Sequence, residues 1–229
     1  MSRIIAIVVA LAVPLAGCGQ GTVPRNDQTG ANNAAQPTAT TPSDRLLAAA
    51  EPFEKLTETA FTEALPALNT TIGEARMAAD GVRDILAAAD VVRIDGLLGD
   101  LRRHRRSENR ADIALTSIEI YRNLVSAVPP GTKVPSAVSL LDYAGFRYQA
   151  DLKASPVRWD DMAAAMRFAR EQWTAIAPQL ASSPLSVTFD AALADMEKAV
   201  AAQDAAAAEK AATAELDLVD ELEGYFNKR

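Results

Sequence analysis

Histidine and cysteine each occur only once among the 229 residues, and these two scarcities exclude several kinds of site. A single histidine, His104, cannot build a metal site with two histidines, or a haem site with two axial histidines, within one chain. A single cysteine, Cys18, leaves no second thiol for an intramolecular disulfide. The fold therefore depends on its hydrophobic core rather than on cross-links.

His104 is flanked by arginines at positions 102, 103, 105 and 106. A Ser-His-Asp triad would need His104 as its base. The four neighbouring guanidinium groups disfavour its protonated form and indicate an exposed turn rather than a dry pocket. We therefore expect a solvated histidine in a charged loop, and no triad.

The chain also lacks the short motifs that bind nucleotides, having no phosphate-binding loop and no glycine-rich turn after a strand. Lysine and arginine number 23 against 30 aspartates and glutamates, which gives a net charge of −7. So acidic a chain is poorly suited to nucleic acid, because that binding needs clustered positive charge. We expect no cofactor, no metal and no nucleic-acid partner.

The first eighteen residues carry a different kind of signal. Arg3 precedes an apolar run, Ile4 to Ala16, that is too short to span a membrane and is typical of a secretory signal. The run closes with Leu15-Ala16-Gly17-Cys18. This segment resembles the signal peptide and lipobox of bacterial lipoproteins, in which the cysteine is acylated and becomes the first mature residue. The resemblance implies lipidation of Cys18, a membrane anchor and a location in the cell envelope.

The same resemblance implies that residues 1–17 are removed as the signal peptide. Because Gly19 is not the aspartate that favours inner-membrane retention in enteric lipoproteins, the default location is the outer membrane, facing the periplasm. Residues 18–42 then form the lipidated cysteine and a tether, since small and polar residues cannot bury enough apolar surface to fold. The folded domain is expected to occupy residues 43–229.

Everything after Pro42 is typical of helix, with abundant alanine, few glycines and no hairpin signal. Thr71 and Glu74 fit a capping box, Ser155 and Ser183 each precede a proline, and Asp204 is a further cap. The expected helices are 43–66, 70–90, 92–105, 108–128, 136–154, 156–181, 185–202 and 204–227, with Pro52 kinking or splitting the first. Short connections favour antiparallel neighbours, so the predicted fold is all-α, an up-down bundle of about seven or eight helices.

Apolar residues recur every three or four positions in several of these segments. One stripe contains Trp159, Met162, Met166, Ala169, Trp173, Ile176 and Leu180, and it predicts that Trp173 lies in the core. The last helix has the stripe Ala205, Ala208, Ala212, Glu215, Val219, Leu222 and Phe226. The segment 110–128 is expected to turn Asp112, Thr116, Glu119 and Asn123 outward.

Four residues are candidates for a ligand site inside the bundle: Tyr143, Arg147, Trp159 and Glu215. An arginine would hold an anion there while aromatic rings stack on the ligand, and Glu215 would bind a cation or handle a proton. The alternative is structural. Tyr143 and Arg147 would then satisfy each other, and Glu215 would reach water or an arginine near the end of the bundle.

Two clusters of charge remain. Asp217, Asp220 and Glu221 share a helix face, where their carboxylates could bind a hard cation or could simply be solvent-exposed. We expect a solvent-exposed face. Arg102, Arg103, Arg105 and Arg106 oppose the acidic balance of the chain. They are candidates for contact with anionic lipid or with an acidic partner, and the alternative is a solvated helix end.

By elimination, we expect a non-catalytic binding or accessory role in the cell envelope. In this role the protein is attached to the membrane through its lipid anchor, and its partner is an envelope protein. One alternative is a binding protein for a small ligand or cation within the bundle. A second is a hydrolase that relies on a pair of carboxylates, because thirty acidic residues always offer pairs.

Overall fold

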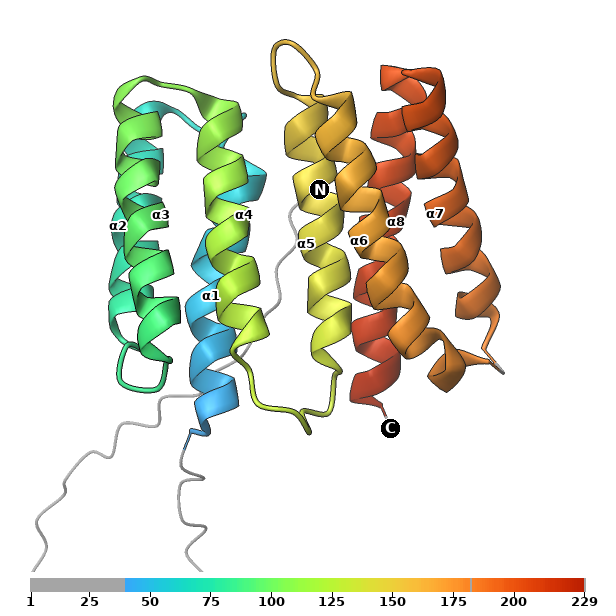
Figure 1. The fold of residues 1–229 in the computed structure, drawn as a ribbon, viewed down its shortest axis with the longest axis horizontal. Helices are drawn as coiled ribbons and strands as arrows, with labels where there is room; N and C mark the ends of the chain where they lie inside the picture. The colour runs from blue at the N-terminus through green and yellow to red at the C-terminus, as the bar shows by residue number, and fades with distance from the viewer. Residues whose placement is uncertain (1–39, 182, 229) are drawn as a thin grey trace, which may run out of the picture. The chain divides into compact units, whose positions relative to one another are not determined.

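The computed structural model describes residues 40–181 and 183–228, and this part of the chain is helical (Figure 1). Its α-helices are α1 (Pro42–Thr59), α2 (Leu65–Asp80), α3 (Ala88–Arg106), α4 (Arg110–Ser126), α5 (Ser136–Leu152), α6 (Trp159–Ile176), α7 (Pro184–Ala202) and α8 (Ala205–Asn227), with a short 3-10 helix, η1 (Ala177–Leu180), after α6. The predicted all-α bundle is confirmed. The predictions for Cys18, for the signal peptide and for nearly all of the tether lie outside the described residues.

The helices form two groups of four that lie side by side (Figure 1). In the first half, α1 packs against α2 and α4, and α3 packs against α4. The second half repeats this order, because α5 packs against α6 and α8, and α7 packs against α8. The halves meet mainly where α4 packs against α5. None of the described helices is long and apolar enough to cross a membrane.

Successive helices run in opposite directions, so their connections collect at two ends of the bundle (Figure 1). We call the end opposite the first residue of α1 the distal end, and it carries the connections 60–64, 107–109, 153–158 and 203–204. There Arg110 donates from Nη1 to the carbonyl oxygens of Ala60, at 2.5 Å, and Glu63, at 2.9 Å. The last carbonyl groups of a helix lack partners within it. Arg110 therefore completes the end of α1 from the start of α4.

Two predicted helix caps are confirmed. The side chain of Ser183 accepts a hydrogen bond from the Leu185 N–H, at 3.3 Å, where α7 begins. Asp204 accepts from the N–H groups of Ala206 and Ala207, at 3.1 and 3.0 Å, where α8 begins. These acceptors satisfy amides that have no partner inside the helix, which allows the two connections to be short.

Two other local predictions are wrong, and a third is wrong in part. Thr71 does not start a helix, since α2 begins at Leu65 and the Thr71 hydroxyl donates to a carbonyl one turn earlier, at 3.3 Å. Threonine and glutamate three residues apart also occur inside helices, so that pattern alone is ambiguous. α6 begins at Trp159 rather than directly after Ser155. Pro52 lies inside α1, which continues through it, so the prediction that it splits this helix is wrong.

The core follows the predicted stripes of α6 and α8. Trp173 is 3% exposed, so its predicted core position is confirmed. Its ring stacks on Phe189 with centroids 4.5 Å apart, and its indole N–H donates to Oδ1 of Asp190 at 2.9 Å. On α8 the stripe is buried from Ala208 onward, and this includes the charged residue Glu215.

α4 has almost no solvent face, because α1, α3 and α5 all pack against it. Thr116 and Asn123 are 8% and 6% exposed, and Asp112 and Glu119 are half-buried. The prediction that these four residues face outward is therefore wrong. A helix between three neighbours needs polar residues where those neighbours supply partners, and spacing alone does not distinguish such a face from a solvated one.

Candidate functional site

A cluster of polar side chains lies where α4 of the first half meets α5 of the second. The Tyr143 hydroxyl donates to Oε1 of Glu119 at 2.6 Å, and Arg147 donates from Nη1 to the same oxygen and, at 2.8 Å, to the hydroxyl. Tyr143 and Arg147 are four residues apart on α5, so they share one face of it. Burial, with the nearby charge of Glu119, raises the pKa of Tyr143 to about 12. These three residues connect the halves by hydrogen bonds.

Asp151 extends this cluster by one turn of α5. Its carboxyl group is almost fully buried, with Oδ2 3.8 Å from Nε of Arg147. Neither of its oxygens accepts a hydrogen bond within the described residues. Burial raises the pKa of Asp151 to about 7, although Arg147 and Arg158 lower it, while Asp161 and Glu119 add to the rise. The charge of this group therefore changes near neutral pH.

The structure does not bring all four predicted ligand-site residues together. Glu215 is fully buried against Gly145 of α5, so it does not reach water at the end of the bundle. Gly145 is two residues from Tyr143 and two from Arg147. Two residues correspond to a rotation of about 200° around the helix axis. Glu215 therefore lies on the opposite side of α5 from those two residues. Trp159 is half-buried at the first position of α6.

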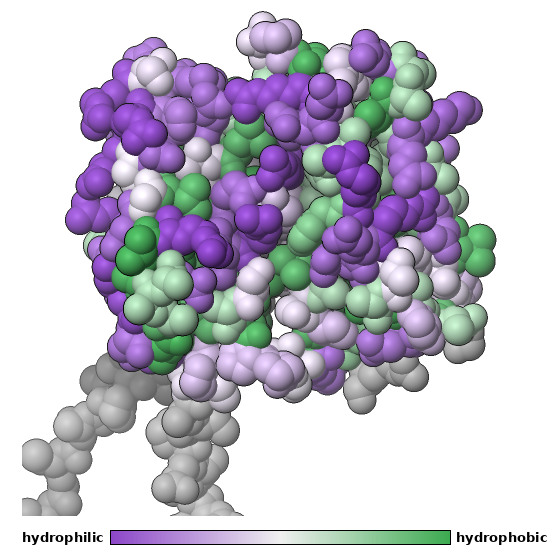
Figure 2. Space-filling model, viewed as in Figure 1, coloured by the Kyte–Doolittle hydropathy of each residue, from purple (hydrophilic) through white to green (hydrophobic). Residues whose placement is uncertain are grey.

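The four candidate arginines of α3 have different surroundings. Nη2 of Arg103 lies 2.6 Å from Oδ1 of Asp100. Arg105 is half-buried and donates to a backbone carbonyl at the start of α2. Arg102 and Arg106 are exposed and form no ion pair within the described residues. Figure 2 shows hydrophilic residues over the upper left of the visible face, where α3 ends. Three of the four arginines are thus exposed, and two of these, Arg102 and Arg106, form no ion pair within the described residues.

His104 lies within the last turn of α3 and is half-buried. The prediction that it is a solvated residue in a charged loop is therefore wrong. Its Nδ1 is 3.6 Å from Oδ2 of Asp112, whose other oxygen lies 2.6 Å from Nη2 of Arg158. On α8, Asp217 and Asp220 are exposed, in keeping with a solvated face. Among the described residues, no group of three or more histidine, cysteine, aspartate or glutamate side chains is arranged to hold a metal ion.

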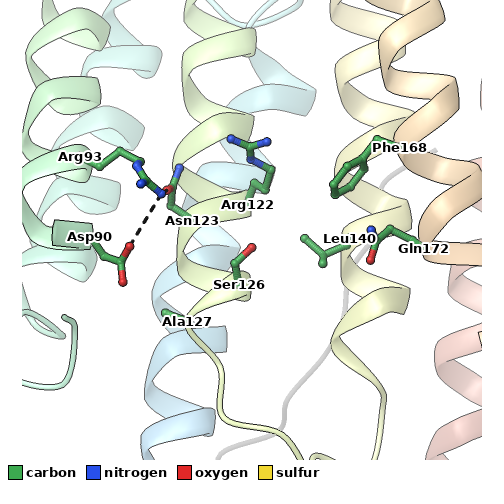
Figure 3. Close-up of a pocket in the computed structure, with 9 residues that line it drawn as sticks. All are labelled: Asp90, Arg93, Arg122, Asn123, Ser126, Ala127, Leu140, Phe168 and Gln172. Atoms are coloured by element: carbon green, nitrogen blue, oxygen red, sulfur yellow. Dashed lines mark hydrogen bonds and ion pairs between the residues drawn. The ribbon is translucent and has the colours of Figure 1, made fainter. Parts of the chain in front are cut away.

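A cleft of about 200 Å³ lies at the junction of the two halves (Figure 3). Its lining includes Asp90 and Arg93 from α3, Arg122 and Asn123 from α4, Leu140 from α5 and Phe168 from α6. In Figure 3 the side chains of α5 and α6 project toward α4, and the arginines lie on the other side of the opening. The cleft thus has arginines on one side, and Leu140 and Phe168 together with the polar Gln172 on the other.

Polar groups of α4 hold both arginines of this cleft in place. Asn123 donates from Nδ2 to the Glu119 carbonyl at 2.6 Å, and its Oδ1 accepts from Nη1 of Arg93 at 3.1 Å. Nη2 of Arg122 lies 2.9 Å from Oε2 of Glu119, and its guanidinium group sits 5.3 Å from the centroid of the Tyr143 ring. Each guanidinium group has five N–H donors, so both retain donors for a ligand.

The sequence contains no motif that pairs Arg93 with Arg122, because their proximity depends on the packing of α3 against α4. No protein-family model, curated protein or solved structure matches this chain. The functional proposals therefore depend on the residues and their geometry.

Proposed function

We propose that this protein is a lipid-anchored accessory protein of the cell envelope whose helical domain binds a partner protein without catalysis. The motif that ends in Cys18 supports the anchor, with the outer membrane, facing the periplasm, as the default location. Exposure of Arg102 and Arg106 at the distal end carries the proposal of partner binding. These two guanidinium groups are exposed and form no ion pair within the described residues, whereas the exposed Arg103 pairs with Asp100.

The chemistry of this surface favours an acidic partner protein. The chain as a whole has a net charge of −7, so the exposed arginines at the end of α3 form a local exception. The distal end lies at the far side of the bundle from the start of α1, where the proposed tether joins the domain (Figure 1). A partner that stands away from the anchoring membrane can therefore reach these arginines.

The test compares two double variants of the full-length protein that lose the same charge. Arg102→Ala with Arg106→Ala should reduce capture of an envelope protein from detergent-solubilised envelope. Arg76→Ala with Arg167→Ala, at exposed positions of α2 and α6, should not. Capture by the unchanged protein should weaken with salt, because exposed charges are screened over ~8 Å at physiological ionic strength.

Equal capture by both double variants would refute the role of the distal end. A second arm uses vesicles that contain anionic phospholipid. If the distal variant loses vesicle binding but keeps its captured protein, the contact is with lipid rather than with a partner. Thermal melting of both variants shows whether either change acts through folding.

The anchor has its own test. Cys18→Ser should abolish labelling by a radioactive fatty acid and leave the protein uncleaved or released from the membrane. Acyl chains gain ~0.8 kcal/mol per buried methylene, so two or more chains are needed for firm attachment. Labelling of the serine variant at the normal level would contradict the proposal.

The two alternative functions differ in their support. A carboxylate hydrolase has little, because Asp151, the carboxyl group whose pKa is near 7, is only 1% exposed and lies outside the cleft. A substrate has no access to it in this conformation. A small-ligand role is favoured by the cleft at the junction of the halves.

A further inference from the structure

We propose that the cleft between α3, α4, α5 and α6 binds a small organic carboxylate. The carboxylate group is held by Arg93 and Arg122, and the apolar part of the molecule packs against Leu140 and Phe168. This site is on a different part of the bundle from Arg102 and Arg106, so it does not depend on the proposed partner binding.

Charge favours an anion at this site. Arg93 and Arg122 line the cleft together with one carboxylate, Asp90, which lies 3.8 Å from Arg93. The carboxylate of Glu119 pairs with Arg122, but it is shared with Arg147. Among the residues that line the cleft, two arginines and one carboxylate therefore leave an excess of one positive charge. Guanidinium groups also match the planar shape of a carboxylate and bind it with two parallel hydrogen bonds.

The two arginines are positioned before any ligand arrives. Arg93 is tied to the buried amide of Asn123, and Arg122 is held by Glu119 over the ring of Tyr143. A side chain that is already ordered loses less conformational entropy when it binds. Both guanidinium groups thus have partners that orient them before a ligand binds, while the Arg93 side chain remains 60% exposed to that ligand.

The other side of the cleft and its size restrict the ligand further. Leu140 and Phe168 are half-buried, and the edge-to-face contact of Phe168 with Tyr143, at 5.2 Å, fixes the ring. The volume, about 200 Å³, is below the range of about 300–1,000 Å³ that is common for drug-sized ligands. A short aliphatic or single-ring carboxylate fits both conditions. Ligand sites are also frequent where two structural units meet, as the halves do here.

The experiment uses the full-length protein in detergent and follows two fluorinated probes by ¹⁹F NMR. One probe is 4-fluorophenylacetate, and the other is 4-fluorophenylacetamide, which has the same ring without the charge. The carboxylate should show saturable broadening, and the amide should not. Arg93→Gln and Arg122→Gln should each weaken binding of the carboxylate about tenfold, because each removes charge-assisted hydrogen bonds.

Two further variants separate this site from general attraction to positive charge. Arg76→Gln removes an exposed arginine of α2 and should leave binding unchanged. Ser126→Trp keeps every charge but fills the cleft from its exposed rim, and it should abolish binding. Equal binding of both probes, or unchanged binding after Ser126→Trp, would overturn the proposal. The absence of saturable broadening in the unchanged protein would do the same.

Discussion

Asp151 shows at the scale of one residue how burial controls charge. Its side chain lies 3.8 Å from Arg147, yet both oxygens lack hydrogen bonds within the described residues. Ionisation is therefore costly in the folded protein, and burial raises the pKa from 3.8 to about 7. Between these two values the folded protein holds a proton that the unfolded chain has released. The contribution of Asp151 to stability is thus full below about pH 4 and is lost as the pH rises to about 7.

Asp151→Asn should remove this dependence while keeping the shape of the side chain. The free energy of unfolding of the variant should exceed that of the unchanged protein above pH 7, by at most about 4 kcal/mol at about 1.36 kcal/mol per pH unit. The difference should shrink as the pH falls toward 4. Urea unfolding at several pH values measures it. Asp195→Asn, at an exposed position of α7, is the control and should show no such trend.

At the scale of one helix, α5 packs against α4, α6 and α8 with different faces. One face presents Tyr143 and Arg147 to Glu119 of α4. Another face brings Gly145 against α8, where a Cβ atom would overlap the Glu215 carboxylate and lie 2.7 Å from Cδ2 of Leu216. The missing side chain of glycine is therefore what permits this close approach of the two helices.

Gly145→Ala should destabilise the protein by about 1–3 kcal/mol, because extra volume in a packed core forces its neighbours to shift. Gly96→Ala is a matched control in α3, where an added Cβ meets nothing within 4 Å. There the better helix propensity of alanine should increase the free energy of unfolding by up to about 1 kcal/mol. Thermal or urea unfolding of the two variants compares them directly. An unchanged or raised stability of Gly145→Ala would show that α5 and α8 are packed less closely.

The predictable helices were those with one buried face. α6 and α8 repeat apolar residues regularly, so Trp173 was placed correctly in the core. α4 lies between three neighbours, and the burial of Asn123 depends on contacts with α3 and with its own preceding turn. The structural alternative to the ligand site, in which Tyr143 and Arg147 satisfy each other, agrees with the hydrogen bond between them. Spacing could not reveal that Glu215 packs on the other side of α5.

At the scale of the whole molecule, the junction between the halves collects most of its unusual chemistry. Glu119 accepts hydrogen bonds across it from Tyr143 and Arg147, and Arg158 lies 2.6 Å from Asp112 of α4. The cleft opens at the same junction. The sequence predicts a bundle, but it does not show which distant helices pair. The contacts of α1 with α4 and of α5 with α8, which define two halves, come from packing alone.

A chain that begins at Thr40 should unfold in one transition, because the junction couples the halves. Both tryptophans lie in α6, so fluorescence reports on the second half, whereas circular dichroism reports on the helices of both. The two transitions should coincide in urea, as two-state unfolding requires.

Glu119→Ala should lower the free energy of unfolding by about 2 kcal/mol, because it removes charged hydrogen bonds at the junction. Glu197→Ala, which breaks the exposed pair with Arg170 inside the second half, should cost less than about 1 kcal/mol. If fluorescence and circular dichroism gave separate midpoints, the halves would be independent folding units that merely share a surface.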